Sequence, residues 1–309
     1  MRSKIKSVIT VALAVCMLAS CNMNPQNTDE STGPTGEPTF VLPTPTPTPE
    51  PEPEPVFPVF RSRVGVPAIE EAEDITKPVT FYLDGEEIKG RITYPEGEGP
   101  FKTIIISSGL YANLGRYTKK AKRYSQAGYC VIEFKFRNGT APNPYKDPKY
   151  LGDFIYEQVK DLNAIVDSTR FIPQVDQSNI YLYGHSMGGL VTAYVGAMRP
   201  QDVKGLLLCD PSYYALKRMK FENGKTITTD LYPHLAKCNF NVLIITGGPK
   251  SFGKDQHVFD DAMANYPNAN MVIIEGADHH FDGTSGDKVV DRSVEIMRYW
   301  DAKERLKQS

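Results

Sequence analysis

Excess charge of either sign is almost absent from this sequence. Its 35 lysines and arginines stand against 37 aspartates and glutamates, which leaves a formal net charge of −2 at pH 7. Nucleic acid is therefore excluded as the main partner, because counterion release at the phosphates requires a dense basic surface. The composition is otherwise that of a globular protein, with 40% hydrophobic residues. Such a chain can bury a large core, so it is not disordered throughout.

Cysteine is scarce as well, and the five cysteines include no Cys-x-x-Cys pair. The pattern therefore contains no cluster of ligands for zinc. Cys130, Cys209 and Cys238 all lie in or beside apolar runs. We expect them to be buried free thiols, with one disulfide among them as the alternative.

The N-terminus has the pattern of an export signal, in which basic residues precede an apolar run over residues 8–19. Twelve residues are too few to cross a bilayer core of about 30 Å as a helix. The run ends in Leu18-Ala19-Ser20-Cys21, which resembles the lipobox of bacterial lipoproteins. This resemblance implies that residues 1–20 are removed, that Cys21 is diacylated, and that the protein is anchored to a membrane outside the cytoplasm. The alternative is an ordinary secretion signal with an incidental cysteine.

Proline dominates the segment that follows. Residues 22–60 hold 11 of the 24 prolines, many of them alternating with threonine or glutamate. Such a run cannot build a core and favours extended polyproline II, at about 3.1 Å per residue. We therefore expect residues 21–60 to form a disordered, semi-rigid stalk, and residues 61–309 to form one folded domain.

From about residue 79, apolar β-rich runs alternate with amphipathic stretches of helical period. This alternation predicts an α/β fold, with a mostly parallel sheet covered by helices on both faces and a small lid or none. Asp84-Gly85 predicts a hairpin between the first two strands, which are expected to be antiparallel. Eight strands are expected, at 79–83, 88–94, 103–107, 129–134, 179–183, 203–209, 241–246 and 270–275. Helices are expected at 117–126, 154–166, from 190 onward, at 256–265, and around Val290, Val294, Met297 and Trp300.

The motif Gly184-His185-Ser186-Met187-Gly188 stands between a predicted strand and a predicted helix. A sharp turn at this place exposes the serine hydroxyl, and small neighbours let the strand and the helix pack closely. With its strand order and its C-terminal histidine, the chain resembles the α/β-hydrolase superfamily over about residues 79–305. Within it, the chain is similar to serine esterases such as feruloyl esterases, platelet-activating-factor acetylhydrolases and dienelactone hydrolases. The resemblance implies that Ser186 is the nucleophile and that no metal or organic cofactor is required.

The segment Gly276-Ala277-Asp278-His279-His280-Phe281 resembles the loop that carries the base in feruloyl and related esterases. On this match His279 is the base and His280 fills a variable position. The family holds the oxyanion with the backbone N–H groups that here belong to Met187 and Leu110. The rival interpretation is a metal site formed by Asp278, His279, His280 and Asp282. Adjacent side chains diverge too much to chelate a metal easily, which argues against that site.

The acid that orients the base is open between two aspartates. Its usual place, about four residues after the seventh predicted strand, is occupied by Lys250, and Asp255 comes five residues later, where it looks more like a helix cap. Asp210 directly follows the sixth predicted strand, where pancreatic-type lipases and platelet-activating-factor acetylhydrolases carry their acid. We therefore predict a triad of Ser186, His279 and Asp210, with Asp255 as the alternative acid.

The predicted function is hydrolysis of carboxylic esters outside the cytoplasm. The His279 loop favours acylated plant polymers as substrates, whereas the place of Asp210 favours lipid-like esters, and a polyester is a third candidate. Tyr111, Tyr213 and Tyr214 are expected either to line the pocket or to pack elsewhere. One alternative is a serine peptidase of prolyl-oligopeptidase type, although about 20 residues before the first strand are too few for a propeller. Another is a surface lipoprotein that binds ligands on a non-catalytic hydrolase scaffold.

Overall fold

The computed structural model describes residues 60–213, 240–251, 260, 263–264 and 266–308. Several predictions fall outside these ranges. They are the signal peptide, the lipidation site Cys21, the stalk up to residue 59, and the expected helix over 256–265 with the alternative acid Asp255. Cys238, Tyr214 and most of the segment in which a lid would lie also fall outside.

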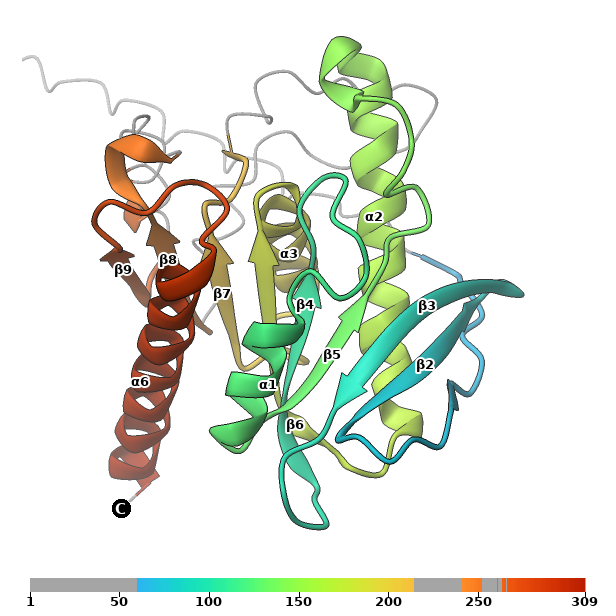
Figure 1. Ribbon diagram of the computed structural model, residues 1–309, viewed down its shortest axis with the longest axis horizontal. Helices are drawn as coiled ribbons and strands as arrows, with labels where there is room; N and C mark the ends of the chain where they lie inside the picture. The colour runs from blue at the N-terminus through green and yellow to red at the C-terminus, as the bar shows by residue number, and fades with distance from the viewer. Residues whose placement is uncertain (1–59, 214–239, 252–259, 261–262, 265, 309) are drawn as a thin grey trace, which may run out of the picture. The chain divides into compact units, whose positions relative to one another are not determined.

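A nine-stranded sheet runs through the described domain in the order β1-β2-β3-β5-β4-β6-β7-β8-β9 (Figure 1). The pairs β1–β2, β2–β3 and β3–β5 are antiparallel, and every other pair is parallel. The predicted mostly parallel sheet is thus confirmed. The strands are β1 (Ala68–Ile69), β2 (Thr76–Leu83), β3 (Glu86–Thr93), β4 (Phe101–Ser107), β5 (Cys130–Phe134), β6 (Val175–His185), β7 (Gly205–Cys209), β8 (Asn241–Thr246) and β9 (Ala269–Ile273).

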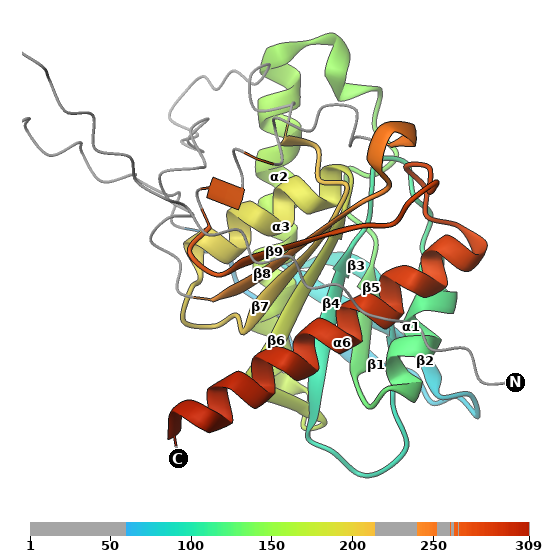
Figure 2. The same cartoon turned by 90° about the vertical axis from the view of Figure 1, so that its left-hand side faces the viewer.

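Helices cover both faces of this sheet, as expected. The longer ones are α1 (Thr118–Gln126), α2 (Pro148–Ser168), α3 (Met187–Met198) and α6 (Gly283–Gln308). Helices α1 and α6 contact each other on one face, and α2 and α3 contact each other on the other (Figure 2). Short 3-10 turns lie at Pro144–Lys146, Thr169–Phe171 and Gly248–Lys250.

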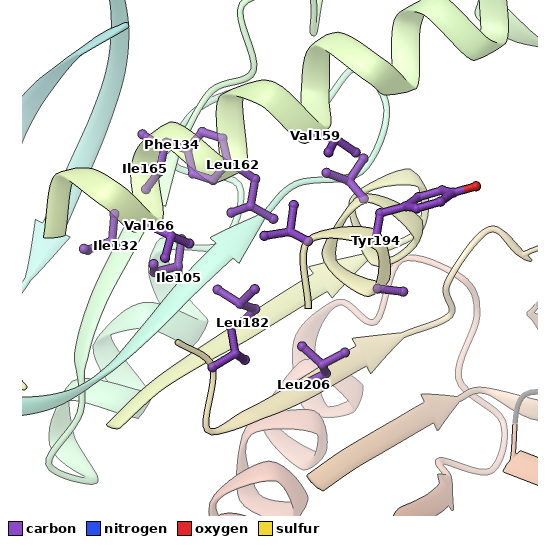
Figure 3. Packing of buried hydrophobic residues seen from close by; sticks show 14 of the residues in the cluster. Ile105, Ile132, Phe134, Val159, Leu162, Ile165, Val166, Leu182, Tyr194 and Leu206 are labelled. Carbon is purple, nitrogen blue, oxygen red and sulfur yellow. The ribbon is translucent and has the colours of Figure 1, made fainter. Parts of the chain in front are cut away.

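Successive residues of each central strand point to different cores. Ile105 packs in the core under α2 and α3, whereas its neighbours Ile104 and Ile106 pack in the core under α1 and α6. Figure 3 shows Ile105 in the same cluster as Leu162 and Val166 of α2. Because both faces of the strand are buried, its sequence is a continuous apolar run and does not alternate. Each such side chain contributes about 1.5–3 kcal/mol through burial.

The structure differs from the prediction at the sheet's first strand and at several element boundaries, most of all at the starts of β6 and α2. β1 (Ala68–Ile69) precedes the eight expected strands and pairs with β2; two residues are too few to show a period of two. β6 begins at Val175, before the apolar run that predicted a strand from residue 179. α2 begins at Pro148, where the Asp147 side chain accepts backbone N–H bonds and caps the helix.

The hairpin at Asp84-Gly85 is present, and both residues have the positive φ that a two-residue turn of this type requires. Cys130 and Cys209 are free and buried, as expected. In the described ranges, the helices lack the combination of length and apolarity that a membrane span needs.

Candidate active site

Ser186 occupies a sharp turn between β6 and α3. Its φ of 56° and ψ of −122° place a non-glycine residue in a backbone region that costs about 1–3 kcal/mol. Hydrogen bonds hold the turn: Ser186 N–H donates to the Cys209 carbonyl at 3.0 Å, and the Ser186 carbonyl accepts from Ser212 N–H at 2.9 Å. This turn projects the hydroxyl beyond the sheet's edge at the start of α3, as the motif predicted.

The glycines of the motif are required by close backbone contacts. A Cβ at Gly184 would lie 2.4 Å from the Gly188 carbonyl oxygen, and a Cβ at Gly188 would lie 2.3 Å from the Ser107 carbonyl oxygen. Real Cβ atoms essentially never come this close. The motif therefore lets α3 start directly against β4 and β6.

His279 lies in the loop between β9 and α6, defined here as residues 274–282. Its Nε2 is 3.0 Å from Ser186 Oγ, and its Nδ1 is 3.0 Å from Asp210 Oδ2. A carboxylate only accepts, so the proton lies on Nδ1, and Nε2 accepts the hydrogen bond that the serine hydroxyl donates. The structure thus brings the three predicted triad residues together. They follow β6, β7 and β9, whose carboxyl ends meet at one edge of the sheet.

Asp210 is fully buried, with 0% of its surface exposed. A buried carboxylate is costly unless it is hydrogen-bonded. Oδ2 accepts a hydrogen bond from the His279 ring, and Oδ1 accepts one from the Ser251 hydroxyl at 3.2 Å. Lys250, which stands at the usual place of the acid, is exposed, and its neighbour Ser251 takes up a supporting contact instead.

The loop between β4 and α1, defined here as residues 108–117, also approaches the serine. A Cβ on Gly109 would lie 3.2 Å from the Ser186 Cβ, so the loop passes directly beside the nucleophile. Leu110 follows Gly109 in this loop and lines the same cavity as Ser186. Met187 is the first residue of α3, with its side chain fully buried. Both predicted oxyanion positions therefore adjoin the serine.

A cavity of about 550 Å³ opens over Ser186 and His279. Tyr111 stands at its wall with 49% of its surface exposed and a strained φ of 61°. Arg116 and Asp282 form an exposed ion pair at 2.9 Å on the same wall. Tyr213, another candidate lining residue, is instead buried in the core, where its hydroxyl lies 3.0 Å from that of Tyr266.

The loop of His279 does not form the rival metal site. In the described part of the chain, no three or more histidine, cysteine, aspartate or glutamate side chains are grouped so that they could hold a metal ion. His280 is exposed on the cavity wall, with its ring 6.0 Å from that of His279. Its ring contacts neither Ser186 nor Asp210 in the hydrogen bonds that hold the triad together.

Four residues contact this site although the sequence did not predict that they would: Tyr117, His185, Ser212 and Ser251. The Ser212 hydroxyl lies 3.4 Å from Ser186 Oγ. The His185 ring is buried, and burial followed by the nearby His279 lowers its pKa to about 3. Each of these residues makes its contact with a segment that is distant in the sequence, so no local pattern identifies it. The one available signal is that Ser212 closely follows Asp210.

Comparison with known proteins agrees with this geometry. A family model described as "Serine aminopeptidase, S33" matches residues 98–243, just under half of the chain. Esterase FrsA of Yersinia pestis (strain Pestoides F) is 26% identical over 146 residues, or 45% of this chain and 33% of that protein. The chain thus spans about a third of the length of the curated relatives that it matches.

Solved structures resemble the chain over most of their own length. Est1E from Butyrivibrio proteoclasticus has a TM-score of 0.56 at 16% identity, covering 73% of this chain and 99% of that one. A second structure of Est1E, with ferulic acid bound, matches with the same score and identity over 71% of this chain and 97% of that one. Dienelactone hydrolase from Anabaena variabilis has a TM-score of 0.55 at 17% identity, covering 76% of this chain and 99% of that one. At such identities the likeness shows a shared fold.

Proposed function

We propose that this chain, which has the α/β-hydrolase fold, is a serine esterase that cleaves carboxylic esters through an acyl-enzyme. One observation carries the proposal: the His279 ring bridges Ser186 Oγ and Asp210 Oδ2, with 3.0 Å on each side. A nucleophile, a base and an orienting acid in one chain of hydrogen bonds form the arrangement that activates a hydroxyl for acyl transfer.

In the proposed mechanism, each step is carried out by a named residue. His279 Nε2 takes the proton as Ser186 Oγ attacks the ester carbonyl, and the Asp210 carboxylate stabilises the imidazolium that forms. The backbone N–H groups of Met187 and Leu110 hold the tetrahedral oxyanion, and each such donor contributes about 2.7–4 kcal/mol. His279 then gives its proton to the leaving alcohol. Water, deprotonated by the same ring, attacks the acyl-enzyme; the acyl–Oγ bond breaks, the acid is released, and Ser186 Oγ takes the proton back from His279.

The proposed substrate is an ester found outside the cell. The lipobox-like segment ending at Cys21 supports export and a lipid anchor, and the proline-rich stalk would hold the domain away from the membrane. An enzyme placed in this way meets esters of the environment. Among these, the fold shared with Est1E, which has been solved with ferulic acid bound, supports aryl esters of plant polymers ahead of lipids and polyesters.

Labelling with a fluorophosphonate probe tests the proposal. We expect one covalent adduct, located at Ser186 by peptide mass spectrometry, together with hydrolysis of short-chain p-nitrophenyl esters. Ser186→Ala is the matched control and should show neither. Unlabelled, inactive protein with a native circular dichroism spectrum would favour a binding lipoprotein on a hydrolase scaffold.

Peptide amides are the second substrate class, because the matching family model is described as a serine aminopeptidase. The same nucleophile, base and oxyanion donors can cleave an amide. Aminoacyl p-nitroanilides and feruloylated saccharides, assayed side by side on the same preparation, separate the two classes. We expect kcat/KM to be higher for the saccharide esters, and a preference for the anilides would assign the peptidase.

The proposed anchor is tested in a bacterial host that lipidates such proteins. The full chain should enter the membrane fraction and incorporate labelled palmitate, and Cys21→Ser should abolish the label. Cys16→Ser, a cysteine within the apolar run, is the control and should stay in the membrane. Palmitate label that persists in Cys21→Ser would contradict the anchor.

A further inference from the structure

A chain of hydrogen bonds links the two loops that flank Ser186. Gly109 N–H, in the β4–α1 loop, lies 3.3 Å from the Tyr117 hydroxyl oxygen, which lies 2.8 Å from His185 Nδ1. On the other side of the same ring, His185 Nε2 lies 2.6 Å from the backbone carbonyl oxygen of His279. One ring therefore connects the neighbour of Leu110 to the backbone of the proposed base.

The direction of every donor in this chain is determined. A carbonyl oxygen only accepts, so His185 Nε2 carries the proton and donates to His279. In the neutral ring Nδ1 must then accept, so the Tyr117 hydroxyl donates to it and accepts in turn from Gly109 N–H. Burial lowers the pKa of His185 to about 3 and raises that of Tyr117. Both groups thus keep one protonation state at neutral pH.

Packing holds both side chains in place. Tyr117 is 5% exposed and His185 7%. The Tyr117 ring meets Tyr183 edge-on at 6.1 Å, and the His185 ring stacks obliquely on His279 at 4.8 Å. A buried polar network that is fully satisfied is rigid, and its members act as a unit.

Two further contacts, one from the β4–α1 loop and one from the start of α1, reach the β9–α6 loop at residues other than His279. Arg116 pairs with Asp282 at the exposed rim, and Lys120 Nζ donates to the Phe281 carbonyl at 2.9 Å. The ring of His185, by contrast, donates directly to the His279 backbone. The position of the imidazole relative to Ser186 therefore depends on His185 more directly than on the other two contacts.

We propose that His185 and Tyr117 are positioning residues, which together hold the Leu110 amide and the His279 ring in register on either side of Ser186. The proposal rests on the esterase function proposed above and extends it. Neither residue transfers a proton to the substrate. Their effect falls on the transition state, because the oxyanion donor and the base must act on the same carbonyl group, and misplacement by about 1 Å can cost about 100-fold in rate.

The test compares variants that break the chain at different bonds. Tyr117→Phe removes the hydroxyl and keeps the ring, His185→Leu removes both ring bonds, and His185→Gln retains a donor that can reach the His279 carbonyl. With a p-nitrophenyl ester, we expect Tyr117→Phe and His185→Leu to lower kcat about 10- to 100-fold with little change in KM. His185→Gln should recover part of that loss. Rates are divided by the number of active sites titrated with fluorophosphonate, so that unfolded protein does not count.

A double mutant and a matched control decide between positioning and general damage. Tyr117→Phe in the His185→Leu background should cost little more than His185→Leu alone, because both changes break one unit. Tyr124→Phe is the control, since Tyr124 is a fully buried tyrosine of α1 whose ring, like that of Tyr117, meets Tyr183 edge-on, and its kcat should stay within about twofold of the native value. Full additivity of the two losses, or native kcat in both single variants, would overturn the proposal.

A second measurement needs no turnover. In ¹⁵N-histidine spectra of the native protein, we expect the His185 ring to remain neutral with its proton on Nε2 from about pH 5 to pH 8. A proton on Nδ1, or titration of this ring within that range, would refute the proposed bonds even in a protein that hydrolyses no ester. If the folded protein shows the expected ring state but hydrolyses no ester, the proposed function is wrong, and so is the proposed effect of His185 and Tyr117 on catalysis.

Discussion

The Ser186 backbone adopts a conformation that residues with a side chain rarely adopt, with a φ of 56°. Asp210 shares this property with a φ of 42°. Neither conformation is stable alone, and each is held by a hydrogen bond to the next strand: Ser186 N–H to the Cys209 carbonyl, and Asp210 N–H to the Ile245 carbonyl at 2.8 Å. The sheet thus supports strain at both positions where the proposed chemistry needs a projecting side chain.

The two adjacent histidines should behave very differently. His279→Ala removes the only ring that bridges Ser186 and Asp210 in the described structure, so we expect kcat for ester hydrolysis to fall by more than about 10⁴-fold. His280→Ala alters an exposed side chain and should leave kcat within about twofold. Steady-state kinetics on a p-nitrophenyl ester check both, and the reverse result would reassign the base.

The acid can be tested in the same assay. Asp210→Asn preserves the shape but favours the wrong imidazole tautomer, so kcat should fall about 10³- to 10⁴-fold. Ser251→Ala removes one hydrogen bond to the same carboxylate and should cost about tenfold, as expected for a bond to a charged group. Near-normal turnover in Asp210→Asn, with loss in Asp255→Asn, would transfer the role to Asp255.

At the scale of elements, each triad residue follows a strand, and α3 is placed against β4 by glycines. Gly188 can come within contact distance of the Ser107 and Ser108 carbonyls only because it has no side chain. Those carbonyls lie at the end of β4 and at the start of the β4–α1 loop, which carries Leu110. A change in the helix start is therefore transmitted directly to the proposed oxyanion donor.

Two glycine-to-alanine changes in α3 separate these effects. In Gly188→Ala the new Cβ meets backbone oxygen at 2.3 Å, whereas in Gly196→Ala it meets the Leu206 side chain at 2.8 Å, which can move. We expect Gly188→Ala to lower stability by about 1–3 kcal/mol and to abolish most activity. Gly196→Ala should keep its activity, because the new Cβ does not touch the residues around Ser186. Its stability should change little, because the higher helix propensity of alanine offsets the crowding against Leu206. Urea unfolding and kcat measure both, and equal loss of activity would contradict the argument.

Local patterns predicted what depends on local physics. Periodicity found the buried strands and α6, where Val290, Val294, Met297 and Trp300 all pack in one core, and the elbow motif located Ser186. The two-residue β1 shows no period, so it was missed. The hydrogen bond between Tyr117 and His185 joins residues that are 68 positions apart. The sequence around either residue gives no sign of it, because only the folded sheet brings the two side chains together.

For the molecule as a whole, two buried groups give stability opposite pH dependences. His185 has a pKa lowered to about 3 from 6.5 by burial and by His279, so the folded state binds fewer protons and stability falls as the pH falls through this window. Asp161 has a pKa raised from 3.8 to about 6, mainly by burial, so stability rises as the pH falls from about 6 to 4. The two contributions partly cancel.

Removing the histidine should expose the opposing contribution. His185→Gln leaves Asp161 unchanged, so its free energy of unfolding should fall less steeply between about pH 6 and pH 4. The difference in slope is at most one proton, or about 1.4 kcal/mol per pH unit. Urea titrations at several pH values across this range measure it. Parallel slopes would show that the folded state does not keep His185 neutral.

The Cys209 carbonyl accepts the hydrogen bond from Ser186 N–H. The Cys209 thiol is buried, and burial raises its pKa to about 12. Such a sulfur is inert while the strand stays closed. A maleimide can therefore reach the thiol only when the end of β7 detaches from its neighbours. The rate of alkylation thus measures how often this end of the sheet opens locally.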